Sequence, residues 1–151
     1  MSSRRQALKQ TAAVASLLAS TGLFPQFAHA FSKEAFEAKS LQDAMKALGT
    51  GALAESKDVT LTGPDIAENG AVVPVGVSTS LPGVKRLLIL VEKNPNALIA
   101  LFNVTDSVEA SFATRTKMGQ SSDVYAVAVM ADGKALYAKK EIKVTLGGCG
   151  G

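Results

Sequence analysis

The fold class is indicated by the stretch Arg86-Leu87-Leu88-Ile89-Leu90-Val91, in which five consecutive apolar residues follow one arginine. An extended strand points successive side chains to opposite faces, so this stretch would present apolar side chains on both faces. Strands of this kind lie inside a protein, where each face is covered. We therefore expect a central strand covered on one side by a second sheet and on the other by a helix or a partner subunit.

Further segments around this strand alternate apolar and polar residues with a period of two, which is typical of strands. The expected strands cover residues 59–62, 71–79, 85–92, 97–104, 109–117, 124–131 and 135–146. Turn signals separate them, among them Asn69-Gly70 and Asp132-Gly133. Pro74 favours a sheet edge or a bulge, because proline cannot donate to a sheet ladder. Seven short strands without a Cys-Trp-Cys core predict an immunoglobulin-like β-sandwich.

A short helical segment is expected before the sandwich, between Ser32 and Leu48. Ser40 followed three residues later by Asp43 resembles a capping box, and Gly49 supplies a stop. The apolar positions with helical spacing are Leu41, Ala44, Met45 and Leu48. The predicted fold is therefore all-β with a short N-terminal helical segment. Its apolar faces leave two alternatives open, a well-filled core or a protein interface of substantial area.

The first thirty residues have the pattern of an export signal. Arg4-Arg5 is the paired arginine of a twin-arginine signal, a moderately apolar run follows over residues 11–27, and Ala28-His29-Ala30 is a small-x-small cleavage site. We expect cleavage after Ala30, a mature protein in the periplasm and no membrane segment in the mature form. The expected organisation is a signal over residues 1–30, a helix and sandwich over residues 31–146, and a C-terminal arm over residues 147–151.

Removing this signal changes the charge of the protein. Arg4, Arg5 and Lys9 are three of the sixteen basic residues, and the remaining thirteen equal the thirteen acidic residues, all of which follow residue 30. The formally neutral mature chain has no Lys/Arg cluster longer than two residues, so a nucleic-acid partner is not expected. No set of metal or cofactor ligands is visible in the sequence, and we expect neither a metal nor a cofactor.

The chain ends in Gly147-Gly148-Cys149-Gly150-Gly151, which contains its only cysteine. Glycines on both sides give the backbone conformations that other residues avoid, and five extended residues reach roughly 17 Å. We interpret this arm as the means by which a thiol enters the clefts of other proteins. The preceding strand would fix the base of the arm and leave its tip free.

The surroundings of Cys149 in the sequence favour a carrier over a catalyst. A thiolate needs a nearby cation, a helix N-terminus or a base, yet the nearest basic residue is Lys143. The only histidine is His29, within the predicted signal, so the mature chain cannot form a Cys-His pair. Activation of the thiol would then come from whichever partner receives the arm.

The tail also has other interpretations. A plain periplasmic binding or interaction module would carry the tail incidentally and use its loops or a sheet face. The final Gly150-Gly151 is also found in ubiquitin-like sulfur carriers, but their chemistry needs ATP, which an exported protein would not meet. A disulfide between Cys149 residues of two copies is a physical alternative for the resting state.

Taken together, these residues resemble the SoxY family, the sulfur-carrier subunits of the periplasmic Sox thiosulfate-oxidising system. The residues that carry the resemblance are the twin-arginine signal, Val73-Pro74-Val75, Asn94-Pro95 and above all the terminal arm around Cys149. The resemblance implies a non-enzymatic carrier with an immunoglobulin-like fold that forms a heterodimer with a SoxZ-like subunit. It further implies that Cys149 carries thiosulfate-derived groups covalently. The haem enzyme SoxAX would attach them, the hydrolase SoxB would release sulfate, and the molybdenum enzyme SoxCD would be an optional further oxidant.

Overall fold

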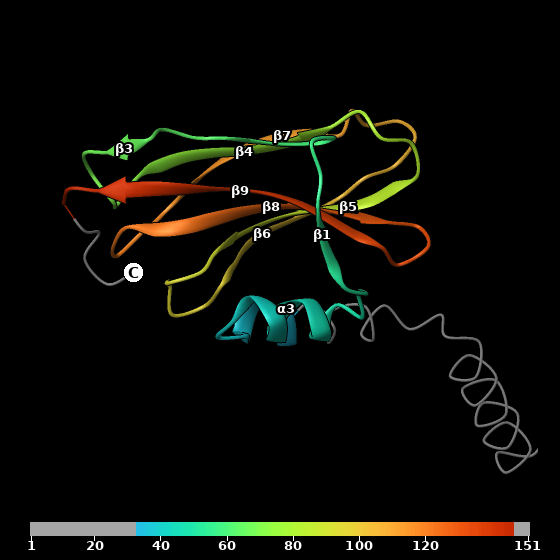
Figure 1. Ribbon diagram of the computed structural model, residues 1–151, viewed down its shortest axis with the longest axis horizontal. Helices are drawn as coiled ribbons and strands as arrows, with labels where there is room; N and C mark the ends of the chain where they lie inside the picture. The colour runs from blue at the N-terminus through green and yellow to red at the C-terminus, as the bar shows by residue number, and fades with distance from the viewer. Residues whose placement is uncertain (1–32, 147–151) are drawn as a thin grey trace, which may run out of the picture.

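The structure, a computed structural model, describes residues 33–146 (Figure 1). The predicted export signal, with Arg4, Arg5, Ala28 and Ala30, lies outside the described residues. The predicted carrier arm, Gly147 to Gly151, lies outside them as well. What the structure describes is therefore the body of the protein up to the last residues before the arm.

Two β-sheets form that body, one above the other, with a helix below the larger sheet (Figure 1). The larger sheet has the order β1-β9-β8-β5-β6, and β3 pairs with β9 off this path. Its strands are β1 (Leu53–Glu55), β3 (Ile66–Ala67), β5 (Val84–Val91), β6 (Leu98–Asn103), β8 (Ser122–Met130) and β9 (Ala135–Val144). The smaller sheet has the order β2-β4-β7, made of β2 (Val59–Thr62), β4 (Val73–Thr79) and β7 (Ser111–Thr116). This strand order is compatible with an immunoglobulin-like sandwich.

The central strand β5 is buried on both faces, as its composition predicts. Leu87, Ile89 and Val91 pack into the core between the two sheets, and Leu88 and Leu90 pack on the opposite face. All five side chains are 0% exposed. Strand β8 repeats the pattern, because Val124, Ala126 and Ala128 belong to the first core while Tyr125, Val127 and Val129 belong to the second. The expectation that both faces of the central strand are covered is confirmed.

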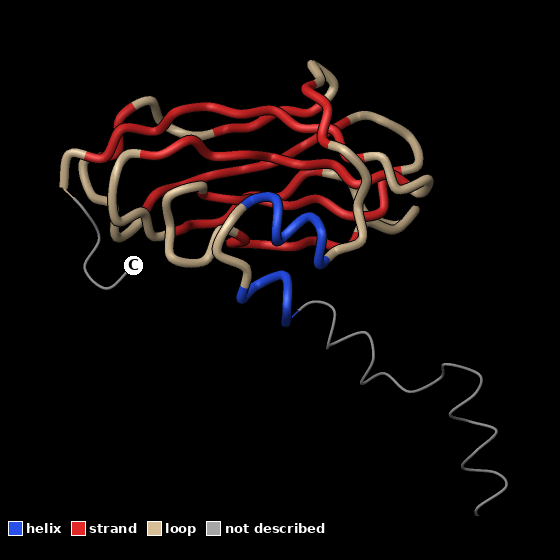
Figure 2. The backbone as a smooth tube through the Cα atoms, turned by 60° about the horizontal axis from the view of Figure 1, so that its bottom comes forward, coloured by secondary structure: helices blue, strands red, loops and turns tan. Residues whose placement is uncertain are grey.

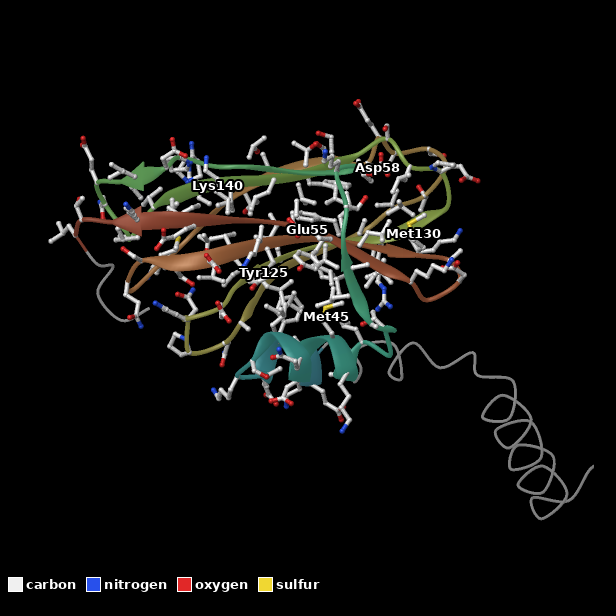
Figure 3. The ribbon with its side chains drawn as sticks, viewed as in Figure 1. Met45, Glu55, Asp58, Tyr125, Met130 and Lys140 are labelled. Atoms are coloured by element: carbon white, nitrogen blue, oxygen red, sulfur yellow. The ribbon has the colours of Figure 1, made fainter. Side chains whose placement is uncertain are left out.

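The second core lies between the larger sheet and the helical segment. Residues 33–37 form a helical turn, and α3 (Leu41–Ala47) follows it. The buried side of α3 consists of Leu41, Ala44 and Met45, and Figure 3 shows Met45 between the helix and the sheet. Gly49 has a φ of +68°, which glycine adopts without strain and which ends the helix. Within the described residues, no helix has the length and apolar character needed to cross a membrane.

The start of α3 gives a first testable prediction. The Ser40 hydroxyl oxygen accepts a hydrogen bond from the backbone N–H of Asp43 at 3.1 Å, which satisfies a donor that the helix itself leaves free. Ser40→Ala should lower the free energy of unfolding by about 1 kcal/mol. Ser80→Ala, in an exposed position with no hydrogen bond from its hydroxyl in the described structure, should change it by less than about 0.5 kcal/mol. Urea denaturation compares the two, and equal losses would contradict the assigned cap.

All seven expected strands are present, and most of their ends differ by one or two residues from the prediction. The expected strand over residues 71–79 is β4, which is the middle strand of its sheet and not an edge strand. Its pairing with β2 stops at Gly76, so Pro74 lies where β4 has only β7 as a neighbour, opposite Arg115. The missing N–H of proline is tolerated at this locally exposed margin. The short strands β1 and β3 were not predicted from the sequence.

Candidate functional site at the root of the C-terminal arm

The site predicted from the sequence is Cys149 with its four glycines, and the structure describes the chain up to Leu146. We call residues Lys143 to Leu146 the arm root, because they lead directly into Gly147. Strand β9 ends within the arm root, at Val144. How these residues are held determines where the arm begins on the surface of the protein.

The arm root is held by strands on both sides of β9. On one side β8 pairs with β9 in antiparallel register, with Ser122 opposite Ile142. On the other side the two residues of β3 pair in parallel, Ile66 with Lys143 and Ala67 with Val144. The N–H of Lys143 donates to the Asp65 carbonyl oxygen at 3.0 Å, and the N–H of Thr145 donates to the Ala67 carbonyl oxygen at 3.1 Å. Near its end, β9 is thus bonded by β8 as far as Ile142 on one edge and by β3 at Lys143 and Val144 on the other.

Two loops extend this attachment beyond the strand. The N–H of Gly70 donates to the Leu146 carbonyl oxygen at 2.7 Å, and the Gly70 carbonyl oxygen accepts from the N–H of Met118 at 2.7 Å. Gly70 is buried and joins the β3–β4 loop, the arm root and the loop after β7. In addition, the N–H of Val144 donates to the Ser121 hydroxyl at 2.8 Å. The arm is therefore anchored as far as Leu146, the last described residue.

A charged contact holds the loop that leads into β3. The Lys140 ammonium, labelled in Figure 3, lies 2.7 Å from the Asp65 carboxylate and donates to the Gly63 carbonyl oxygen at 2.8 Å. The hydrogen bond and the positive charge of Lys140 lower the pKa of Asp65 below its ordinary value. A lowered carboxyl pKa stabilises the fold above the pKa of the unfolded state, and this contribution is lost as the pH falls through the folded pKa. Because Asp65 is exposed, water screens the contact and its contribution is small.

Exposed apolar side chains lie at the arm root, among exposed polar residues such as Asp65, Glu68 and Lys143. Among the described residues, the exposed large hydrophobic side chains are Ile66, Val72, Val108 and Leu146. Ile66 pairs with the arm root, Leu146 belongs to it, and Val72 follows the loop that binds it. The exposed fractions of these three side chains are 57%, 66% and 54%, respectively. Nothing in the sequence indicates that Ile66, Gly70, Val72 or Ser121 lies at the arm root, because their relation to the arm exists only in the folded chain.

The chain has one cysteine, Cys149, and one histidine, His29, and both lie outside residues 33–146. Within those residues no three His, Cys, Asp or Glu side chains are grouped so that they could hold a metal ion. What the described part offers at the start of the arm is a hydrogen-bonded base with three exposed apolar side chains.

These features define a β-sandwich protein whose last strand carries a lone cysteine on a terminal glycine segment. The family model described as sulfur oxidation protein SoxY matches residues 44–149, more than half of the chain and up to Cys149 itself. The chain belongs to the SoxY family. No curated protein sequence matches it.

The solved structures agree with this assignment. The sulfur carrier protein SoxY from Chlorobium limicola f thiosulfatophilum is 34% identical to this chain, with a TM-score of 0.64, over 71% of this chain and 97% of that one. A superoxide reductase (neelaredoxin) from Ignicoccus hospitalis superposes with a TM-score of 0.51 at 16% identity, over 57% of this chain and 79% of that one. At this low identity the second likeness shows a shared fold alone. The all-β fold predicted from the sequence is confirmed.

Proposed function

We propose that this chain is a sulfur carrier of thiosulfate oxidation in which Cys149 is the point of covalent attachment. Membership of the SoxY family supports the carrier role, and the match of the family model up to Cys149 is the observation that carries the assignment. The arm root supports a short tether for the thiol, because the chain is hydrogen-bonded up to Leu146 and Cys149 follows three residues later. That span is at most about 11 Å at 3.3 to 3.6 Å per residue.

The proposed chemistry on Cys149 conserves atoms and charge. In the loading step the thiol and thiosulfate form a sulfur–sulfur bond, releasing one proton and giving two electrons to the haem enzyme SoxAX. In the next step the hydrolase SoxB adds water across the terminal sulfur–sulfur bond, which releases sulfate and leaves a persulfide on the cysteine. Where SoxCD acts, it would take six electrons from that persulfide while three waters supply oxygen, leaving an S-sulfonate on the cysteine, and hydrolysis of the S-sulfonate would release a second sulfate and restore the thiol. The carrier itself only holds and presents the sulfur.

The residues near the arm support a carrier that holds the sulfur while its partner enzymes perform the reactions. A thiol becomes a good nucleophile when a cation or a base lowers its pKa. The arm itself has no basic side chain, and the nearest in sequence is Lys143, whose backbone is fixed in β9. A short tether therefore suits delivery of the thiol to partner active sites, each of which supplies its own activating groups.

The proposal extends to compartment and partners. Residues 1–30 are a twin-arginine signal cut after Ala30, which places the mature carrier in the periplasm, and residues 31–146 form the body that carries the arm over residues 147–151. A SoxZ-like subunit is the heterodimer partner. Export in the folded state is consistent with this partner. A SoxZ-like subunit without its own signal would cross by the twin-arginine route while bound to this chain.

Truncation separates this proposal from a binding module with an incidental tail. A chain that ends at Leu146 should fold with an unchanged unfolding temperature, because the buried residues described in the structure lie between Ala35 and Ile142. It should bind the SoxZ-like subunit as the full chain does, measured by calorimetry, and support no thiosulfate oxidation by the reconstituted system. Retained oxidation by the truncated chain would show that the tail is incidental.

A further inference from the structure

The end of β9 is held differently from the rest of the strand. Strand β8 pairs with β9 from Ala135 to Ile142, so the four residues of the arm root lie beyond that pairing. Ile142 is 0% exposed and belongs to the core between the two sheets. In the arm root only Val144 is partly buried, and its other three residues are exposed. The part of β9 that is fixed by packing therefore ends at Ile142, four residues before the last described residue.

Beyond Ile142 the chain is held mainly by one short segment. We call residues 64–69 the strap, because this segment contains β3 and runs beside the end of β9 (Figure 1). Carbonyl oxygens of the strap accept the N–H groups of Lys143 and Thr145. The Glu68 carbonyl oxygen also accepts a hydrogen bond from the Thr145 hydroxyl at 3.2 Å. Outside the strap, hydrogen bonds to the arm root come from Gly70 and Ser121.

The strap buries little apolar surface. Only Ala67 of its six residues is buried, and Pro64 is half-buried. The exposed residues of the strap are Asp65, Ile66, Glu68 and Asn69. Stabilisation by burial grows with the apolar area removed from water, which is small for an alanine side chain. Segments that are held by hydrogen bonds with few buried apolar contacts open locally at low free energy. The strap and the arm root together have this character, and Ile142 does not.

Both ends of the strap are fixed to the body independently of the arm root. At its start the Lys140 ammonium, labelled in Figure 3, contacts the Asp65 carboxylate and the Gly63 carbonyl oxygen. Just after its end, the Gly70 carbonyl oxygen accepts the N–H of Met118, whose side chain is 0% exposed. The residues between these two points can therefore separate from the arm root while the ends of the strap stay in place. Such an opening is local and leaves both cores intact.

We propose that the strap opens reversibly and sets the length of the carrier arm. With the strap closed, the tether runs three residues from Leu146 to Cys149, at most about 11 Å. With the strap open, the arm root joins the tether, which then runs seven residues from Ile142 to Cys149, at most about 25 Å. A partner enzyme with a deep active site binds the open form more tightly and shifts the equilibrium toward it. The opening follows from the packing of the body, and its use in delivery rests on the proposed carrier role of Cys149.

Hydrogen exchange of single amides, followed by NMR on the chain purified after export and kept under reductant, tests the opening. Lys143, Thr145 and Gly70 each lose an N–H hydrogen bond when the strap and the arm root separate. Their amides should share one protection factor, at least about a hundredfold below that of Val127 in β8. A protection of Lys143 equal to that of Val127 would overturn the proposal, because the strap would then stay closed while only the last residues fray.

A matched pair of serine variants tests which contact holds the strap closed. Ser121→Ala removes the acceptor of the Val144 N–H and should lower the shared protection of the arm root about three- to tenfold. Ser80→Ala, at an exposed position in another loop, should leave it unchanged. The protection of Val127 should be the same in both variants. Equal protection of the arm root in both variants would overturn the proposal.

A shortened arm tests whether the released residues serve as tether. Deletion of Gly147 and Gly148 removes two residues of the tether and should lower the rate of thiosulfate oxidation by the reconstituted system at least about tenfold. Ser121→Ala should recover part of that rate, because opening adds four residues to the tether, and Ser80→Ala should not. No recovery by Ser121→Ala would overturn the role of the strap in setting the length of the arm. The carrier role is tested separately, since only an active Cys149→Ser chain contradicts it.

Discussion

Replacing Cys149 with serine is expected to abolish thiosulfate oxidation by the reconstituted system while the protein folds normally. A hydroxyl group does not form the sulfur–sulfur bond on which loading depends, and no second cysteine exists to take its place. The buried residues that the structure describes end at Ile142, so the free energy of unfolding should change by less than about 0.5 kcal/mol. Oxidation of thiosulfate with the reconstituted enzymes measures the first effect and urea denaturation the second.

A matched variant tests whether the position of the thiol matters. Ser80 is exposed and lies in the connection between β4 and β5, away from the arm root in the chain. Ser80→Cys in the Cys149→Ser background restores one exposed thiol without the glycine arm. This chain should remain inactive, because a thiol without a tether does not reach the interior of a partner enzyme. Activity regained in this variant would show that any surface thiol suffices.

The largest effect on stability is expected from Leu88→Ala. Leu88 is 0% exposed and packs in the core between the larger sheet and the helices. Removal of a buried leucine side chain leaves a cavity and costs about 2 to 5 kcal/mol, a large part of the 5 to 15 kcal/mol that stabilises a typical domain. Because the chain has no tryptophan, urea unfolding is best followed by far-UV circular dichroism.

Two controls accompany that substitution. Leu88→Met conserves volume and should cost less than about 1.5 kcal/mol. Leu146→Ala changes a leucine that is 66% exposed and should cost less than about 0.5 kcal/mol. If Leu88→Ala does not fold in water, the free energy of unfolding is measured for Leu88→Val instead, which removes less of the buried side chain. Equal losses at positions 88 and 146 would contradict the assignment of Leu88 to a core.

The sandwich could be predicted from the sequence because its strands carry their own signals. Five consecutive apolar residues after Arg86 predict a strand covered on both faces, and the structure places the helices on one face and the smaller sheet on the other (Figure 2). The Ser40 cap was likewise visible, because a capping serine and its donor are three residues apart. Such local signals need no knowledge of distant parts of the chain.

The details around the arm root could not be predicted in the same way. Strands β1 and β3 are three and two residues long, too short for a period-two pattern, and each exists only because β9 lies beside it. Ile66 pairs with Lys143, far along the sequence, so nothing local indicates the contact. Asn69-Gly70 did predict a turn, but the hydrogen bond of Gly70 to Leu146 depends on the tertiary fold. The chemistry that we propose for the arm, in contrast, rests on residue types alone.

The most direct test of the carrier role is the intact mass of the protein purified from cells that are oxidising thiosulfate. The account predicts added masses of sulfur and sulfur–oxygen groups that a reductant removes, that peptide mapping assigns to Cys149, and that are absent from the Cys149→Ser chain. A Cys149 that remains a free thiol while thiosulfate is being oxidised would contradict it.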